Sequence, residues 1–277
     1  MKLLINVFLI LLIFGVLTVV SQIGGLVFLL AIPIYRLIDR KTNGMWRRAV
    51  FKFFSFAMLY LMFVFIVVPL VARQFGRVPL PILETNYLKP ATIWTVLLNR
   101  NYVKPQLKEI AYKVSIKLNA TYPGAKVNYL EANFPFVDGF PLLPHLSHND
   151  GKKLDLSFQY NSSITNKISY GVPSFTGYGV CEEPLANEQD MPGYCREKGF
   201  WQYNALRVLI PQDNKAKFTF DKGRTRTLVD LFAEHESIGK IFIEPHLQHR
   251  LGLTSSKIRF HGCHAVRHDD HLHVQLK

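Results

Sequence analysis

The chain has 277 residues, of which 49% are hydrophobic, and its mean hydropathy is slightly positive. This composition is too apolar for a disordered chain and too polar for a transporter with many spans, so it is typical of one soluble domain with a membrane anchor. The net charge of +13 indicates an acidic partner, and charge alone does not distinguish phospholipid, nucleic acid and an anionic wall polymer. Three cysteines without a Cys-x-x-Cys pair exclude a disulfide scaffold, a zinc ribbon and a thioredoxin-like redox centre.

Two long apolar segments predict helices that cross a membrane. Residues 3–35 contain no charge and exceed the about 20 residues that a bilayer-spanning helix needs. A secretory signal peptide has a shorter apolar core followed by a cleavage site, so we interpret this segment as an uncleaved span. A break at residues 21–25 would instead fold it into a hairpin. Residues 53–72 are a second charge-free run and predict a second span.

The segment between the two apolar runs sets their orientation. Residues 36–52 carry six basic residues and a single acidic residue, Asp39. Short loops this basic stay in the cytoplasm, so the chain after residue 72 is expected outside, whether the first run is one span or a hairpin. The N-terminus lies outside in the first case and inside in the second. The expected organisation is a membrane anchor over residues 1–72, a tether over 73–104 and an extracytoplasmic domain over 105–277.

The extracytoplasmic part contains signals for both helices and strands. Residues 73–104 are rich in proline and indicate an irregular tether with short helices at most. Apolar residues at three-to-four spacing predict an amphipathic helix over 104–122, and a second helix is predicted over 226–237. Strands are predicted over residues 126–132, 154–160, 205–210, 241–244 and 271–276. Together these elements predict one α+β domain with an antiparallel sheet.

All ten histidines lie outside the apolar runs, and two groups of them suggest metal chemistry. His271 and His273 are two apart in the predicted terminal strand, so they project from one face and can reach one bound atom. Asp155 begins another predicted strand, and His148 lies in the glycine-containing loop before it, so the chain can fold back and bring both side chains to one point. Two histidines and a carboxylate suit Zn²⁺ with one position open for water, which the ion would activate. The pair His271 and His273, or the pair His148 and Asp155, could each occur by chance. The combination of the two pairs favours a metal site.

These residues also resemble a known family. The lysostaphin, D-alanyl-D-alanine peptidase and hedgehog group of zinc peptidases has motifs similar to Ser147-His148-Asn-Asp-Gly151-Lys-Lys-Leu-Asp155 and His271-Leu-His273. Within that group the murein endopeptidases that are insensitive to penicillin are the most similar, through His145-Leu-Ser-His148 and His268-Asp-Asp-His271-Leu-His273. The resemblance covers roughly residues 127–277 and does not include the apolar runs.

The resemblance implies a zinc site and an activity. It implies that His148, Asp155 and His273 bind Zn²⁺. It also implies that His271 acts on the water or the transition state and that His145 and His268 line the site. The proton donor would be His268 or His271. The expected function is a membrane-anchored zinc metallopeptidase that hydrolyses peptide bonds in peptidoglycan stems or cross-links. The expected location is the bacterial cytoplasmic membrane, and the expected partners are peptidoglycan peptide and membrane lipid, without nucleic acid.

Lys152 and Lys153 depart from the family pattern, which usually has apolar, small or acidic residues between the glycine and the aspartate. Lysines beside a metal ligand could disfavour a second cation, select an acidic substrate or mark an inactive copy. The alternative function is therefore a catalytically inactive module of the same fold that binds the cell wall or a partner enzyme.

The cysteines suggest one structural bond. Cys181 and Cys195 enclose a loop rich in glycine, proline and acidic residues. In an oxidising compartment they could pair and stabilise that loop by about 3 kcal/mol. Cys263 is expected to be a buried thiol.

Overall fold

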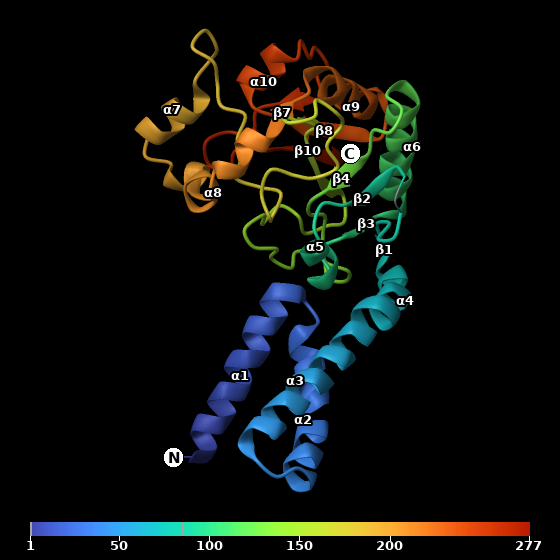
Figure 1. The fold of residues 1–277 in the computed structure, drawn as a ribbon, viewed down its shortest axis with the longest axis vertical. Coiled ribbons are helices and arrows are strands. Elements are labelled where there is room, and N and C mark those ends of the chain that lie inside the picture. The colour runs from blue at the N-terminus through green and yellow to red at the C-terminus, as the bar shows by residue number, and fades with distance from the viewer. Residues whose placement is uncertain (1, 85) are drawn as a thin grey trace.

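The computed structural model describes residues 2–84 and 86–277. Met1, in the predicted anchor, and Thr85, in the predicted tether, lie outside the described residues. Figure 1 shows a group of long N-terminal helices at one end and an α+β domain at the other. The N-terminal end of the chain lies far from the α+β domain, near the turn between α2 and α3.

The first apolar run is two helices, as in the hairpin alternative, and not one continuous helix. The run divides into α1 (Lys2–Ser21) and α2 (Gly24–Lys41), which pack against each other as a hairpin. At the break, a Cβ atom on Gly24 would lie 2.7 Å from the carbonyl oxygen of Leu17, and one on Gly25 would lie 2.1 Å from the hydroxyl oxygen of Thr18. Only glycine therefore allows the two helices to approach this closely.

The second apolar run belongs to one long helix. It consists of α3 (Met45–Met62), the π-helical turn η1 (Phe63–Val67), α4 (Val68–Ala72) and the 3₁₀ turn η2 (Arg73–Phe75). The helices Leu4–Ser21 and Met45–Phe75 each contain a strongly apolar stretch of 18 residues, of which only 6% and 11% are buried within the protein. Helices that are apolar over their exposed surface are typical of membrane spans, so these two could cross a membrane.

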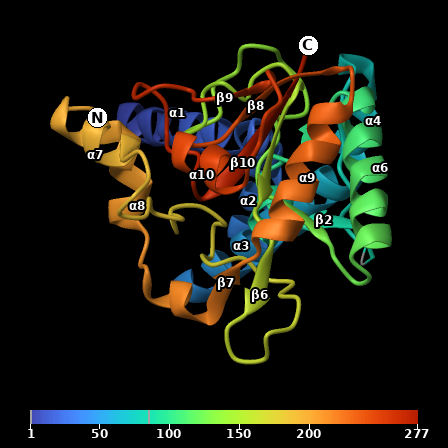
Figure 2. The same ribbon diagram turned by 90° about the horizontal axis from the view of Figure 1, so that it is seen from above.

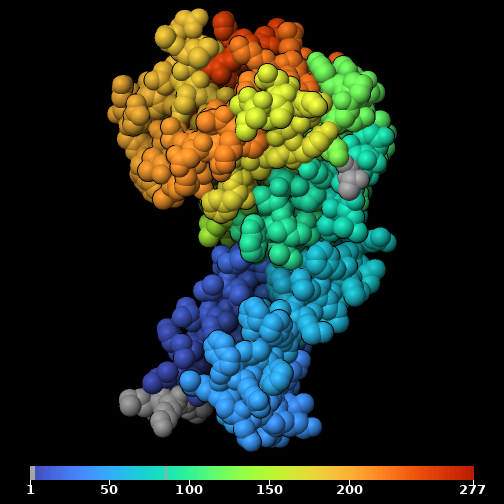
Figure 3. Space-filling view, in the orientation of Figure 1, coloured from blue at the N-terminus to red at the C-terminus, as the bar shows by residue number. Residues whose placement is uncertain are grey.

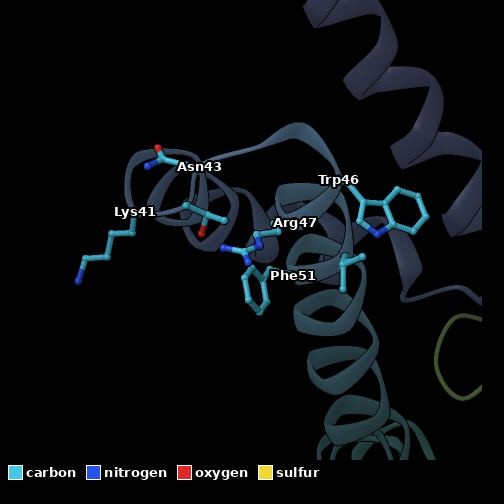
Figure 4. A pocket seen from close by; sticks show the side chains of 7 residues that line it. Lys41, Asn43, Trp46, Arg47 and Phe51 are labelled. Atoms are coloured by element: carbon cyan, nitrogen blue, oxygen red, sulfur yellow. The ribbon is translucent and has the colours of Figure 1, made fainter.

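Basic and aromatic side chains gather at the turn between α2 and α3. Figure 4 shows Lys41 and Arg47 with Trp46 and Phe51 around a pocket at this turn. Trp46 is 79% exposed. Lysine, arginine and tryptophan are the residues that concentrate where a span meets the cytoplasmic surface of a membrane.

The α+β domain is built on a mixed six-stranded sheet. Its strands, in spatial order, are β2 (Leu88–Pro90), β4 (Val127–Tyr129), β5 (Lys153–Ser157), β10 (His271–Leu276), β8 (Ile238–Phe242) and β9 (Ile258–Arg259). The central pairings are antiparallel, as predicted, but β2 pairs with β4 and β9 pairs with β8 in parallel. The α+β class is therefore confirmed, and the purely antiparallel sheet is wrong at both edges.

Residues 73–104 contribute regular elements where an irregular tether was expected. β1 (Val78–Pro79) pairs with β3 (Tyr102–Val103), α5 (Ile93–Leu97) is a short helix, and β2 forms an edge of the main sheet. Short strands that pair only with distant segments are hard to predict from the local sequence. Whether such a segment forms a strand depends on the partner with which it can form hydrogen bonds.

Two long helices cover one face of the sheet. α6 (Pro105–Thr121) and α9 (Lys222–Glu234) lie side by side in Figure 2 and contact each other, and both were predicted within a few residues. Leu107 and Ile110 of α6 and Leu228 and Phe232 of α9 are buried in the main core. The opposite face of the sheet is consequently free to carry polar side chains.

A further lobe lies between β6 (Tyr160–Ser162) and its partner β7 (Phe218–Phe220). It holds α7 (Met191–Glu197), η3 (Trp201–Asn204), α8 (Ala205–Leu209) and η4 (Asp213–Lys217). The strand predicted over residues 205–210 is wrong, because α8 lies at the surface with Val208 80% exposed and Leu209 74% exposed, away from any strand edge. The remaining short helix, α10 (Pro245–Arg250), follows β8.

The predicted disulfide between Cys181 and Cys195 is wrong. Cys195 is bonded to Cys263, whose sulfur was expected to be a free thiol, and Cys181 is a buried free thiol. The bond joins α7 to the loop that leads to β10, across 68 residues of sequence. Proximity along the chain favoured the wrong pair, because the fold brings a distant loop closer to α7.

Candidate metal centre

The two central strands place the predicted ligands opposite each other. In the register of β5 and β10, His273 pairs directly with Asp155. Side chains alternate between the faces of a strand, so Leu154, Leu156 and Leu272 enter the core beneath the helices while Asp155 and His273 project from the other face. Asp155 is fully buried and His273 is 3% exposed.

His148 reaches the same point from the loop before β5. Gly151 in this loop has a φ of 76°, a left-handed conformation that favours glycine, and it turns the chain into the strand. His148 Nδ1 lies 2.6 Å from the carbonyl oxygen of Ala132, to which it donates a hydrogen bond. This bond orients the ring and leaves Nε2 to face Asp155 and His273.

Three potential ligand atoms converge in this space. His148 Nε2 lies 3.1 Å from His273 Nδ1 and 3.2 Å from Asp155 Oδ1, and His273 Nδ1 lies 2.8 Å from Asp155 Oδ1. Ligand atoms around a tetrahedral zinc ion lie about 3.3 Å apart. The buried His148, Asp155 and His273 group could therefore hold a metal ion.

The electrostatics of the group also suit a cation. Burial raises the pKa of Asp155, but the neighbouring imidazoles of His148 and His271 outweigh it and hold the pKa well below its usual range. Burial lowers the pKa of His273 to about 4 despite the adjacent carboxylate. An ionised carboxylate beside a neutral imidazole is the state in which both side chains bind metal.

His271 lies beside the ligand group without joining it. Its Nδ1 donates a hydrogen bond to Asp270, and its Nε2 lies 3.7 Å from Asp155 Oδ2. Burial opposes protonation of His271, but the charges of Asp270 and Asp155 outweigh it and raise its pKa to about 9. His271 Nε2 has no hydrogen-bond partner among the described residues, so it can donate a proton to a group bound at the site.

His268 differs from His271 in its charge state. Its ring centroid lies 4.9 Å from that of His271 and 5.8 Å from that of His273. Burial, reinforced by the charge of His271, lowers the pKa of His268 well below its usual value. Of the two histidines considered as proton donors, the structure therefore favours His271 as the charged one.

Residues that the sequence did not single out complete the surroundings of Asp155. The Tyr178 hydroxyl donates a hydrogen bond of 2.8 Å to Asp155 Oδ2. His145 Nδ1 lies 2.8 Å from Glu131 Oε2, and Glu131 Oε1 accepts a 2.6 Å hydrogen bond from Arg100. Tyr178, Glu131 and Arg100 lie far from the histidine motifs in the sequence, and no spacing pattern connects them to the site. Asp270 is different, because its position next to His271 could have indicated a role at the site.

The two lysines that depart from the family pattern bond to residues other than the candidate ligands. Lys153 Nζ donates to Asp150 Oδ2 at 2.6 Å, and Lys152 Nζ donates to the backbone oxygen of Lys277 at 2.9 Å. Because both ammonium groups are held by other partners, they leave the space between His148 and Asp155 to a cation.

A cavity of about 310 Å³ adjoins the site. Glu131 and Tyr178, which contact the candidate ligands or their neighbours, form one wall, and Trp94 and Phe175 form another. The arrangement as a whole combines a cation site with one charged and one neutral histidine next to it, a set that can polarise a carbonyl and transfer a proton. Comparison with models of protein families and with curated proteins finds no match for this chain.

Proposed function

We propose that the protein is a membrane-anchored zinc peptidase of the bacterial envelope, which hydrolyses peptide bonds in peptidoglycan stems or cross-links. The observation that carries the proposal is the convergence of His148, Asp155 and His273 at one buried point, with His271 beside them. The motifs that meet there are those that resemble the murein endopeptidases. The disulfide between Cys195 and Cys263 supports an oxidising compartment outside the cytoplasm.

In the proposed mechanism each side chain has a separate task. Zn²⁺ held by His148, Asp155 and His273 would supply a Lewis acid that polarises the scissile carbonyl and lowers the pKa of water. His271, charged at neutral pH, donates a hydrogen bond from Nε2 to the developing oxyanion or a proton to the leaving amine. Asp270 holds the His271 ring from the other side, and Tyr178 holds the Asp155 carboxylate.

The alternative is an inactive module that binds the wall or a partner enzyme. Its support in the sequence is the pair Lys152 and Lys153. Since both ammonium groups bond to other residues, neither obstructs the ligand group, and the enzyme is the better account.

The activity can be tested on the full-length protein in detergent, loaded with zinc. It is incubated with intact murein sacculi, and the released fragments are identified by mass spectrometry. His271→Ala is expected to keep its metal and its fold while cleavage falls by at least about a hundredfold, because a positioned acid or oxyanion partner is lost. His249→Ala, which removes an exposed histidine on α10, is the matched control and is expected to cleave normally.

Chelator-treated wild-type protein provides the baseline. If the wild type releases no more fragments than this baseline while it still sediments with sacculi, the peptidase function is wrong and the binding module replaces it.

A further inference from the structure

The α+β domain contacts the end of α1 and the side of α3. Asn99 Nδ2 donates to the carbonyl oxygen of Ser21 at 3.4 Å, the Tyr60 hydroxyl donates to the carbonyl oxygen of Leu97 at 2.7 Å, and the backbone amide of Phe136 donates to the side chain of Gln22 at 3.0 Å. In Figure 1, α5 is the element of the domain next to this junction. These contacts fix the height of the domain above the helices.

A short chain of side chains connects the junction to the candidate metal site. Arg100 Nη2 lies 3.5 Å from the carbonyl oxygen of Val20 in α1, and Arg100 Nη1 donates to Glu131 at 2.6 Å. Glu131 contacts His145, whose Nδ1 lies 3.8 Å from Asp155 Oδ2. Only Arg100, Glu131 and His145 therefore stand between the last turn of α1 and a candidate ligand.

The length of the second apolar helix indicates where a bilayer would end. The helix Met45–Phe75 has 31 residues, which corresponds to about 45 Å. A bilayer with its headgroup layers is about 40 to 45 Å thick. With Trp46 at the cytoplasmic surface, the far end of this helix lies at the outer headgroup layer. The base of the domain, which contacts Tyr60 halfway along the helix, then reaches into the outer leaflet.

Exposed apolar side chains lie near the cavity that adjoins the candidate site. Trp94 of α5 is 58% exposed and Phe175 is 68% exposed, and both line the cavity that adjoins Glu131 and Tyr178. Leu143 and Leu146, on either side of His145, are 50% and 56% exposed. We call Trp94, Leu143, Leu146 and Phe175 the apolar rim. Such a patch is costly in water but fits the outer surface of a bilayer, where aromatic side chains concentrate.

We propose that the apolar rim rests on the outer leaflet and that the cavity beside it admits a peptide whose other end is anchored in the membrane by a lipid. This inference rests on the proposed peptidase function and names its substrate class. The reason is geometric: the cavity mouth, the apolar rim and the end of α1 lie together, so a peptide that rises from the bilayer meets the site before one that hangs from a distant wall layer. The hydrophobic rim shields the lipid-proximal part of such a substrate from water.

The position of the rim can be measured without any enzymatic activity. The chain has three tryptophans, Trp46, Trp94 and Trp201, so double Trp→Phe variants leave one reporter each. The full-length variants are reconstituted into phospholipid vesicles that contain lipids brominated on their acyl chains, which quench nearby tryptophan fluorescence. Trp94 is expected to lose most of its fluorescence, as is Trp46, whereas Trp201, which is 78% exposed in η3, is expected to keep it. Equal fluorescence of the Trp94 and Trp201 reporters would overturn the placement of the rim.

The substrate class is tested with one murein cross-link peptide in two forms. One form is free in solution, and the other is coupled to a phospholipid headgroup in the vesicles that carry the protein. The wild type is expected to cleave the coupled peptide faster by at least about tenfold, because anchoring raises its effective concentration at the site. Trp94→Ala combined with Phe175→Ala is expected to lose most of this preference, while Trp201→Ala, which removes an exposed tryptophan elsewhere, is expected to retain it.

The outcomes separate this inference from the peptidase function. Cleavage of both forms with a preference that the rim variant leaves unchanged would refute the lipid-anchored substrate while the peptidase function stands. Cleavage of neither form, with zinc bound, would refute the peptidase function and with it the substrate assignment.

Discussion

Asp155 is the residue on which the candidate centre depends. It is a fully buried carboxylate with imidazole nitrogens of three histidines within 3.7 Å. A buried charge without compensation is expensive, and a divalent cation compensates it more completely than a shared proton. Asp155 also holds the pKa of His148 above its ordinary value in spite of burial, so protons compete with a metal ion for the same nitrogen.

At this scale we predict the metal content of two aspartate variants. The wild-type protein is expected to carry about one zinc ion per chain, and Asp155→Ala is expected to weaken zinc binding by more than about a hundredfold, because two remaining ligands hold the ion poorly. Asp230→Ala is the control, since Asp230 lies on α9 at the other face of the sheet. Zinc is measured by atomic emission after gel filtration. Full occupancy in Asp155→Ala would remove Asp155 from the site.

At the scale of elements, the sheet and the α7–α8 lobe contribute differently. β5 and β10 are central strands with complete neighbours, so the ligands they carry are held rigidly. The lobe with α7, η3 and α8 has few buried apolar residues, and the disulfide ties it to the loop before β10. That bond therefore restrains the loop from which His268 and His271 follow.

The disulfide predicts a specific response to reductant. A bond that closes a loop of this length typically stabilises a protein by about 2 to 4 kcal/mol, mainly by restricting the unfolded chain. Replacing Cys195 and Cys263 with Ala is expected to lower the melting temperature by roughly 5 to 15 °C and to abolish the effect of reductant. Cys181→Ala is expected to keep the effect, because Cys181 is a free thiol. A reductant response lost in Cys181→Ala would instead restore the Cys181–Cys195 pairing, because that pairing needs the Cys181 sulfur. Melting is followed by circular dichroism of the full-length protein in detergent.

At the scale of the whole molecule, the α1–α2 hairpin decides the side on which the N-terminus lies. The ends of α1 and α4 both reach the α+β domain, whereas the N-terminal end and the α2–α3 turn lie together at the opposite end (Figure 1). Figure 3 shows the same division, with the N-terminal helices below the body of the domain. A membrane around these helices therefore separates the domain from both the basic turn and the N-terminus.

Reporter fusions test this topology directly. With the basic turn in the cytoplasm, alkaline phosphatase at the C-terminus is expected to be active, since this enzyme requires export. A fluorescent protein fused before residue 1 is expected to fold and fluoresce in the cytoplasm. A single first span would place that N-terminal fusion outside, so an exported, dark N-terminal reporter beside an active C-terminal phosphatase would contradict the hairpin. Inactive phosphatase at the C-terminus would contradict the orientation itself.

The sequence by itself determined the features that local periodicity and charge control. Charge-free runs identified the apolar helices, three-to-four spacing identified α6 and α9, and the alternation of residues 271–276 placed His271 and His273 on one face of β10. These features depend on residues close together in the chain, whose geometry is set by the helix and strand repeats.

Only the tertiary structure decided what depends on segments far apart. It broke the first run into a hairpin, because Gly24 and Gly25 gain close contacts with α1 that a sequence pattern does not display. It paired Cys195 with Cys263 and turned part of the predicted tether into a sheet edge. It brought His148 to His273 across 125 residues and set Tyr178 beside Asp155. Each of these outcomes follows from the register and packing of distant segments, which satisfy buried polar groups and fill the core only in the folded chain.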